Sequence, residues 1–148
     1  MTHSNIHHFH LYVATVLDTL YRHFPLECDL TLVEQLQASG YTGLIQIDEF
    51  QHIISDEQAK HQSRILDATI RWLENSGYIT ARNHRPLVVW EDACLTHRAI
   101  ELLGATPPEL SRHTPLGEML GKAVQEGMTD TIRKGVTTLF NLATGQLN

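Results

Sequence analysis

The sequence is short of cysteine, of long apolar runs and of basic residues, and each shortage excludes a class of protein. Cys28 and Cys94 are the two cysteines among 148 residues, too few for a disulfide-rich scaffold. No stretch of about 18 apolar residues occurs, so we expect no ordinary transmembrane helix. The first residues lack a basic segment followed by an apolar one. We therefore expect no signal peptide and a cytoplasmic protein of bacterial type.

The charge is negative and unevenly distributed. The chain has 17 acidic residues and 11 Lys or Arg, a formal net charge of −6. Residues 1–113 hold 14 of the acids and eight of the bases, whereas residues 114–148 hold three of each. Such acidity disfavours general attraction to nucleic acids and anionic membranes. A hydrophobic content of 42% is enough for the core of one domain.

Motifs of catalysis are also absent. We find no glycine-rich phosphate loop after a predicted strand, no nucleophile elbow and no pair of carboxylates in an apolar setting. Two sets of side chains could bind metal: His3, His7, His8 and His10 near the N-terminus, and Cys94 with His97. The histidines lie at a chain end that should fray and cannot hold a ligand geometry, and Cys94 with His97 supplies only two of the four ligands of a structural zinc site. We expect a non-enzymatic protein without cofactor or metal.

Two helices are predicted before residue 40. Apolar residues recur every three or four positions from residue 6 onward and so share one helical face: Phe9, Val13, Val16, Leu17, Leu20 and Phe24. Pro25 ends this helix. A short helix follows, capped by Asp29 or Thr31 and ended by Gly40. Residues 44–54 fit neither a strand nor a helix clearly, and we interpret them as a short connector.

The segment 55–103 contains the clearest succession of predicted helices and strands in the chain. A capping box at Ser55–Gln58 predicts a helix from Asp56 to Ser76, and Gly77 ends it. A strand at 78–80, a polar tip at 81–86 and a strand at 87–90 predict a β-hairpin, and a helix is predicted at 94–103.

Two motifs in this segment are typical of one fold. Trp72-Leu73 precedes Gly77-Tyr78-Ile79, and Leu95-Thr96 precedes Ala99 and Leu102-Leu103. By these motifs the chain resembles bacterial winged helix-turn-helix regulators, although Ala99 stands where glycine is usual. The resemblance covers residues 56–103 and, more loosely, 9–103. It implies a mainly α fold with a small β-hairpin, forming a winged-helix domain at residues 6–104.

The resemblance also implies a function. Residues 56–76 would be the recognition helix and residues 81–86 the wing, so the DNA-binding side chains would be Lys60, His61, Arg64, Arg71, Arg82, His84 and Arg85. Acidic residues at the helix start and the net acidity oppose DNA binding, because affinity depends largely on phosphate neutralisation. Winged helices also bind proteins, and the charge favours that function slightly. A third interpretation is a solvated face without a partner.

The C-terminal part contains the longest apolar pattern. A proline-rich linker at 105–113 precedes a predicted amphipathic helix at 114–143, whose apolar stripe comprises Leu116, Met119, Leu120, Ala123, Val124, Met128, Ile132, Val136, Leu139 and Phe140. The winged helix has no obvious need of this stripe, so we predict that it forms a homo-oligomer. The alternatives are that the helix folds back on its own domain, or that it binds a foreign partner or a membrane surface. The balanced polar face disfavours the membrane.

Overall fold

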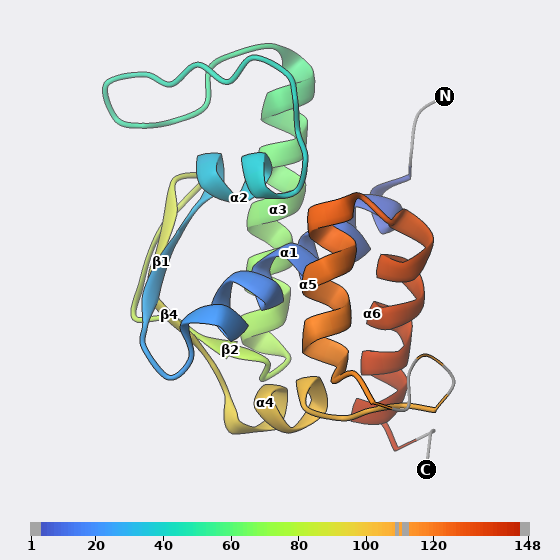
Figure 1. Cartoon of the computed structure of the whole chain (residues 1–148). Coiled ribbons are helices and arrows are strands. Elements are labelled where there is room, and N and C mark those ends of the chain that lie inside the picture. Colours follow the sequence, from blue (N-terminus) through green and yellow to red (C-terminus); the bar gives the residue numbers. More distant parts are fainter. Residues whose placement is uncertain (1–3, 109, 111–112, 146–148) are drawn as a thin grey trace.

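The computed structural model describes residues 4–108, 110 and 113–145. The helices and strands of this part follow one another as α1 (Asn5–His23), β1 (Cys28–Thr31), α2 (Leu32–Ala38), α3 (Glu57–Asn75), β2 (Ile79–Thr80), β3 (Asn83–Arg85), β4 (Val89–Leu95), α4 (His97–Leu103), α5 (Leu116–Glu126) and α6 (Thr129–Ala143). The fold is mainly helical with a small antiparallel sheet (Figure 1). None of the described helices is long and apolar enough to cross a membrane.

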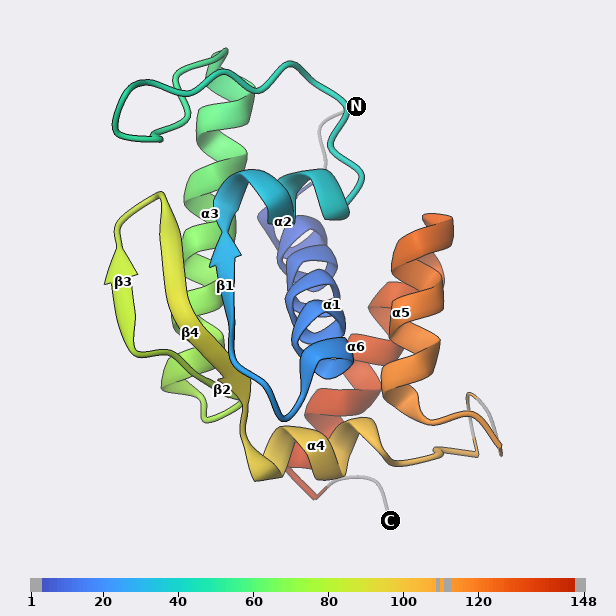
Figure 2. The ribbon, with the colours of Figure 1, turned by 60° about the vertical axis from the view of Figure 1, so that its left-hand side comes forward.

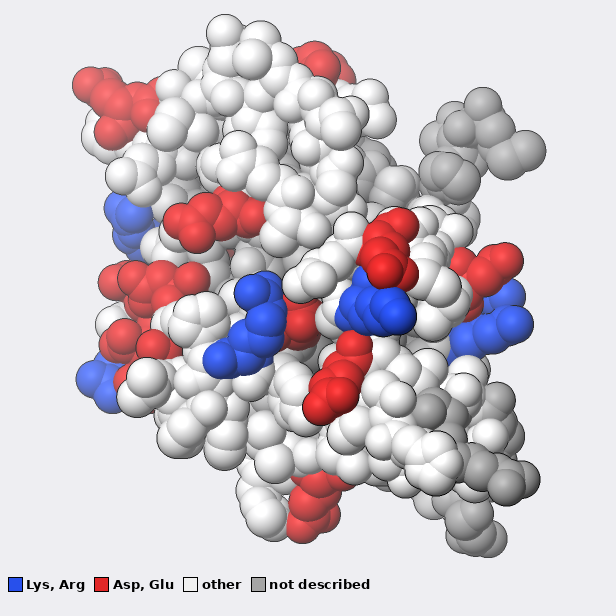
Figure 3. Space-filling view, in the orientation of Figure 1, with Lys and Arg blue, Asp and Glu red and all other residues white. Residues whose placement is uncertain are grey.

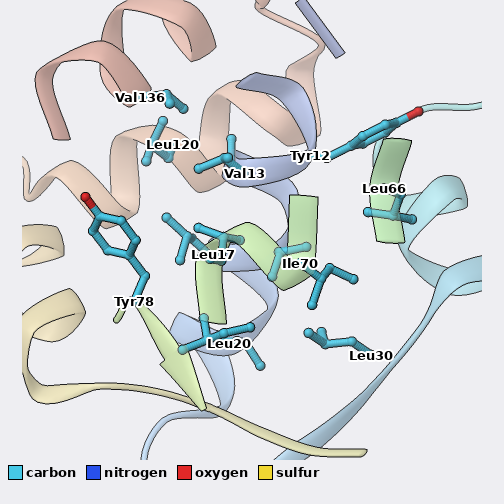
Figure 4. Packing of buried hydrophobic residues seen from close by; sticks show 14 of the residues in the cluster. Tyr12, Val13, Leu17, Leu20, Leu30, Leu66, Ile70, Tyr78, Leu120 and Val136 are labelled. Atoms are coloured by element: carbon cyan, nitrogen blue, oxygen red, sulfur yellow. The ribbon is translucent and has the colours of Figure 1, made fainter. Parts of the chain in front are cut away.

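Helix α1 is the centre of the molecule. The Ser4 hydroxyl caps it, and its middle turns are buried on more than one side. Figure 4 shows Val13 and Leu17 lying between Ile70 of α3 and Leu120 of α5. Helices α5 and α6 cover one side of α1, and α3 lies on the other (Figure 1). One hydrophobic core therefore includes both the N-terminal and the C-terminal parts of the chain.

The sheet is built around β4. Strand β4 pairs antiparallel with β1, β2 and β3, in the order β1-β4-β2 with β3 also on β4. The sequence analysis missed β1, a four-residue strand directly before α2. It also placed Cys94 at the start of a helix, which is wrong: Cys94 pairs with Thr80 in the sheet. The helix starts later because the Thr96 hydroxyl accepts a hydrogen bond from the Ala99 amide and caps α4.

The hairpin also differs from its prediction. The predicted tip, residues 81–86, contains strand β3, and the turn lies at residues 86–88. The Val88 amide donates to the Arg85 carbonyl across this turn, and Leu87 has φ of 60°. The helix predicted at 56–76 is confirmed as α3, with Asp56 as its cap. Ser55 does not cap α3, because its hydroxyl accepts from the Gln46 amide instead.

The single helix predicted at 114–143 is wrong, because the chain forms two helices there. Gly127 adopts φ of 67° at the end of α5, a conformation that glycine reaches without steric cost, and α6 then returns beside α5. Glycines permit the close packing: a Cβ on Gly117 would lie 2.8 Å from the Tyr21 ring, and one on Gly121 would meet the Asp18 carboxylate. Of the predicted linker, residues 109, 111 and 112 lie outside the described residues.

This arrangement changes the interpretation of the apolar stripe. The stripe packs inside its own chain, which is the fold-back alternative. Six of its ten residues are buried: Leu116, Leu120, Ala123, Ile132, Val136 and Leu139. Met119, Val124 and Phe140 are partly exposed, and Met128 is exposed. Self-association stays a prediction, but the six buried side chains cannot contribute to it while α5 and α6 lie against α1.

Candidate interaction surface

A polar cluster joins α3 to the β-hairpin. The Trp90 indole N–H donates to the Asp67 carboxylate at 3.0 Å, and His84 Nε2 lies 3.1 Å from the same oxygen. Arg71 lies 3.0 Å from His84 Nδ1. Because an arginine can only donate, Nδ1 accepts and Nε2 carries the proton, which donates to Asp67. The His84 ring also stacks on Trp90, with centroids 3.8 Å apart.

This cluster uses two of the side chains that were predicted to contact DNA. Arg71 and His84 were correctly placed on neighbouring elements, but they bind each other and fix the hairpin to α3. Asp67 and Trp90 complete the cluster, and the sequence analysis assigned no role to either. An aspartate and a tryptophan separated by 23 residues give no periodic signal, so only the folded chain reveals this pairing.

Two further predicted DNA contacts are neutralised by nearby acids. Arg82 lies 3.6 Å from Glu27 and 3.7 Å from Asp92, and Lys60 lies 3.6 Å from Glu57. Such exposed ion pairs contribute little to stability, but they reduce the positive charge offered to a phosphate. On the face shown in Figure 3, acidic and basic side chains are interspersed and form no continuous basic patch.

Three predicted contacts remain available. His61 and Arg64 on α3 and Arg85 on β3 are exposed, and among the described residues no acidic side chain lies within salt-bridge distance of them. They belong to the two elements that were predicted to form the recognition helix and the wing. The predicted footprint of seven side chains is thus reduced to three.

An apolar loop projects from the end of the molecule near the start of α3. This loop, which we call the finger (residues 44–55), connects α2 to α3 and extends away from the helices (Figures 1 and 2). It exposes four large apolar side chains: Leu44 (68%), Ile47 (49%), Phe50 (64%) and Ile54 (50%). Loops of this length without regular structure are uncommon in compact domains and are usually functional.

The finger has a defined conformation of its own. Ile47 and Ile53 form a β-bridge, and Ile53 is buried in the core. The Asp48 carboxylate accepts from the Phe50 amide at 2.8 Å and from the His52 amide at 2.9 Å. These backbone hydrogen bonds, the one from His52 first, lower the pKa of Asp48. Phe50 is therefore exposed on a preformed turn, which reduces the conformational entropy lost on binding.

We expect Asp48→Ala to loosen the finger without unfolding the protein, because the Phe50 and His52 amides lose their acceptor. Hydrogen exchange measured by NMR should become faster at these two amides and stay unchanged in α1. The lowered pKa gives the sign of the pH effect: the carboxylate stabilises the turn fully above its ordinary pKa, and this stabilisation is lost as the pH falls through the lowered value. Unchanged exchange at both amides would contradict this assignment.

A second apolar feature is a groove between α1 and α3, which we call the α1–α3 groove. It has a volume of about 320 Å³ and is open to solvent, with Asn5, Ile6, Phe9, Ile65, Ala68, Thr69 and Trp72 as its lining. Trp72 and Phe9 meet edge to face at 5.1 Å between ring centroids, and both rings contact Phe140 of α6. The sequence predicted Phe9 on the apolar face of the first helix, and this opening was not predicted.

The candidate metal ligands do not converge. Among the described residues no group of three or more His, Cys, Asp or Glu is placed to bind a metal ion. Cys28 and Cys94 are free thiols on the adjacent strands β1 and β4, and burial is the main cause that raises the pKa of Cys28. His10 lies on α1, where burial is the main cause that lowers its pKa. His3 lies outside the described residues.

No family model, curated protein or solved structure matches the chain.

Proposed function

We propose that residues 6–104 form a winged helix-turn-helix domain. Three helices and four strands follow one another in the order α1, β1, α2, α3, β2, β3 and β4, and β4 lies between β1 and the other two strands. The hairpin beside α3 is then the wing. The link between α2 and α3 departs from the usual turn of three or four residues, because the finger is inserted there.

We infer that the protein is a non-enzymatic adaptor or regulator that binds another protein. The observation that carries this inference is the finger, whose four exposed apolar side chains stand on a preformed turn. Clustered exposed apolar residues mark interaction sites in soluble proteins, and aromatic residues dominate binding energy at interfaces. The α1–α3 groove adds a second apolar site on the same molecule.

Capture from a nuclease-treated bacterial lysate tests this function. We expect the wild-type chain, used as bait, to retain at least one protein, and Phe50→Ser to lose it because the central apolar side chain is removed. Gln46→Ser is the matched control, since Gln46 is an exposed finger residue whose recorded hydrogen bonds use its backbone. Retention of nothing by a wild-type chain that is also monomeric in solution, or of the same proteins by Phe50→Ser, would contradict protein binding through the finger.

DNA binding is the second candidate, favoured by the exposed Arg64 on α3 and Arg85 on the hairpin. If the protein binds DNA, an electrophoretic shift with genomic fragments should fall steeply with salt, because each phosphate contact releases counterions. Arg64→Ala together with Arg85→Ala should abolish the shift, and Arg133→Ala on α6 should leave it unchanged. Because so few basic side chains remain available, we expect no shift at low salt. A salt-sensitive shift lost in the double variant would establish DNA binding instead.

A further inference from the structure

The finger and the α1–α3 groove are chemically complementary. The finger presents Phe50 at its turn with Ile47 and Ile54 behind it, all exposed. The groove offers Ile6, Phe9 and Trp72 around an open hollow of about 320 Å³. This volume is at the lower end of the range for ligand pockets and is lined mostly by apolar side chains. It therefore suits a few apolar side chains better than a cofactor with charged groups.

The charges around the two features are of opposite sign. Glu49 is exposed beside Phe50, and Asp48 adds a second carboxylate to the turn. On α3, Arg64 lies one helical turn before Ala68, so it borders the groove without being part of its lining. Arg64 is exposed and lines a separate hollow with Ile53 and Leu87. An acidic apolar loop is the partner that this border favours.

The finger cannot enter the groove of its own chain in this structure. Figures 1 and 2 both show the turn of the finger pointing away from the start of α1, which forms one wall of the groove. The buried Ile53 and the β-bridge between Ile47 and Ile53 hold the base of the finger in this direction. Any finger that occupies this groove must therefore belong to a different molecule.

In a dimer with two-fold symmetry, the finger and the groove of each copy would both be occupied. Each copy carries one finger and one groove, so two chains related by such an axis make the same contact twice. This doubles the buried area, and stable interfaces bury about 1,200–2,000 Å². The carboxylates of each finger would then lie near the basic border of the facing groove.

We propose that Phe50 of one copy occupies the α1–α3 groove of a second copy and that the protein is a two-fold dimer through two such contacts. This inference rests on the proposed function, since it names the protein that the finger binds. The proposed site of self-association is thus the finger with the α1–α3 groove and no longer the C-terminal stripe. Phe50, Ile6 and Trp72 are exposed in the single chain, whereas most of the stripe is buried.

Solution mass by sedimentation of the full-length protein tests the dimer. We expect Phe50→Ser to weaken dimerisation roughly tenfold or more, as removal of a central aromatic anchor commonly does. Ala68→Glu should do the same, since it places a carboxylate in the groove without breaking α3. The matched controls are Gln46→Ser on the finger and Gln125→Glu on α5, which is exposed and not part of the groove lining; both should dimerise like the wild type.

Mixing the two defective variants gives the sharpest test. A chain with Phe50→Ser keeps an intact groove, and a chain with Ala68→Glu keeps an intact finger. Each alone should dimerise more weakly than the wild type, whereas the mixture, which has one fully intact contact, should dimerise more strongly than either variant alone. A wild-type monomer at every concentration, or a dimer indifferent to both substitutions, would overturn the inference.

The same variants separate this inference from the proposed function. If the wild type is monomeric while lysate capture of a foreign protein depends on Phe50, the second copy is the wrong partner and protein binding by the finger stands. If the wild type is monomeric and captures nothing, both the dimer and the proposed function are wrong.

Discussion

Leu120→Ala is expected to destabilise the whole chain by about 2–5 kcal/mol, the usual loss when a buried leucine is truncated. Leu120 is fully buried in α5, between α1 and α6. Its side chain also lies where a Cβ on Gly135 would stand, so the two helices meet without space between them. Thermal and urea unfolding of the full chain, followed by circular dichroism, should show one transition at a lower midpoint.

The neighbouring residue provides the matched control. Met119 lies on the same turn of α5 but is partly exposed, so Met119→Ala should cost clearly less. If Leu120→Ala left the main transition unchanged and only added a separate early one, α5 and α6 would be an independent unit. If the substitution changed the mass of an oligomer but not the stability of the monomer, the stripe would serve self-association after all.

The second large effect is expected at Trp90. Trp90 is 1% exposed in the centre of the sheet, stacks on His84 and donates to Asp67. We expect Trp90→Ala to cost about 3–5 kcal/mol through the cavity alone. The Asp67 carboxylate would also lose a donor while remaining largely buried, which adds to the loss. Urea unfolding monitored by circular dichroism gives the free energy.

Trp72 is the control for Trp90, because it is also a tryptophan but is 39% exposed at the α1–α3 groove. Trp72→Ala should cost less stability and should instead weaken dimerisation. Trp90→Phe separates the two contributions of Trp90: it keeps most of the volume but removes the N–H donor. A stability loss for Trp72→Ala as large as that for Trp90→Ala would contradict the central role of the α3–hairpin cluster.

Local patterns in the sequence determined much of the secondary structure. Helices α1, α2 and α3 follow from apolar residues at helical spacing and from caps at Thr31 and Asp56, although the cap of α3 was placed one residue early. These signals are local, because each hydrogen bond of a helix joins residues four apart. The resemblance implied a mainly α fold with a small β-hairpin, and a mainly helical fold with a small antiparallel sheet is confirmed.

Features that depend on distant partners were predicted poorly. Strand β1 has only four residues and is a strand because β4, some 60 residues later, supplies its hydrogen-bond partners. The break at Gly127 was not expected, because a glycine in a helical pattern costs only about 1 kcal/mol and the pattern continues on both sides. Burial of Val136 and Leu139 in the core, when α6 folds back, offsets this cost.

The candidate interaction surface was also predicted only in part. The sequence by itself determined that basic residues would lie on α3 and the hairpin, since their spacing fixes the element that carries them. Only the tertiary structure decided that Arg71 and His84 bind each other, that Arg82 meets Glu27 and that Phe50 stays exposed. Hydrophobicity alone does not say which apolar side chains are covered, because burial depends on the elements that pack over them.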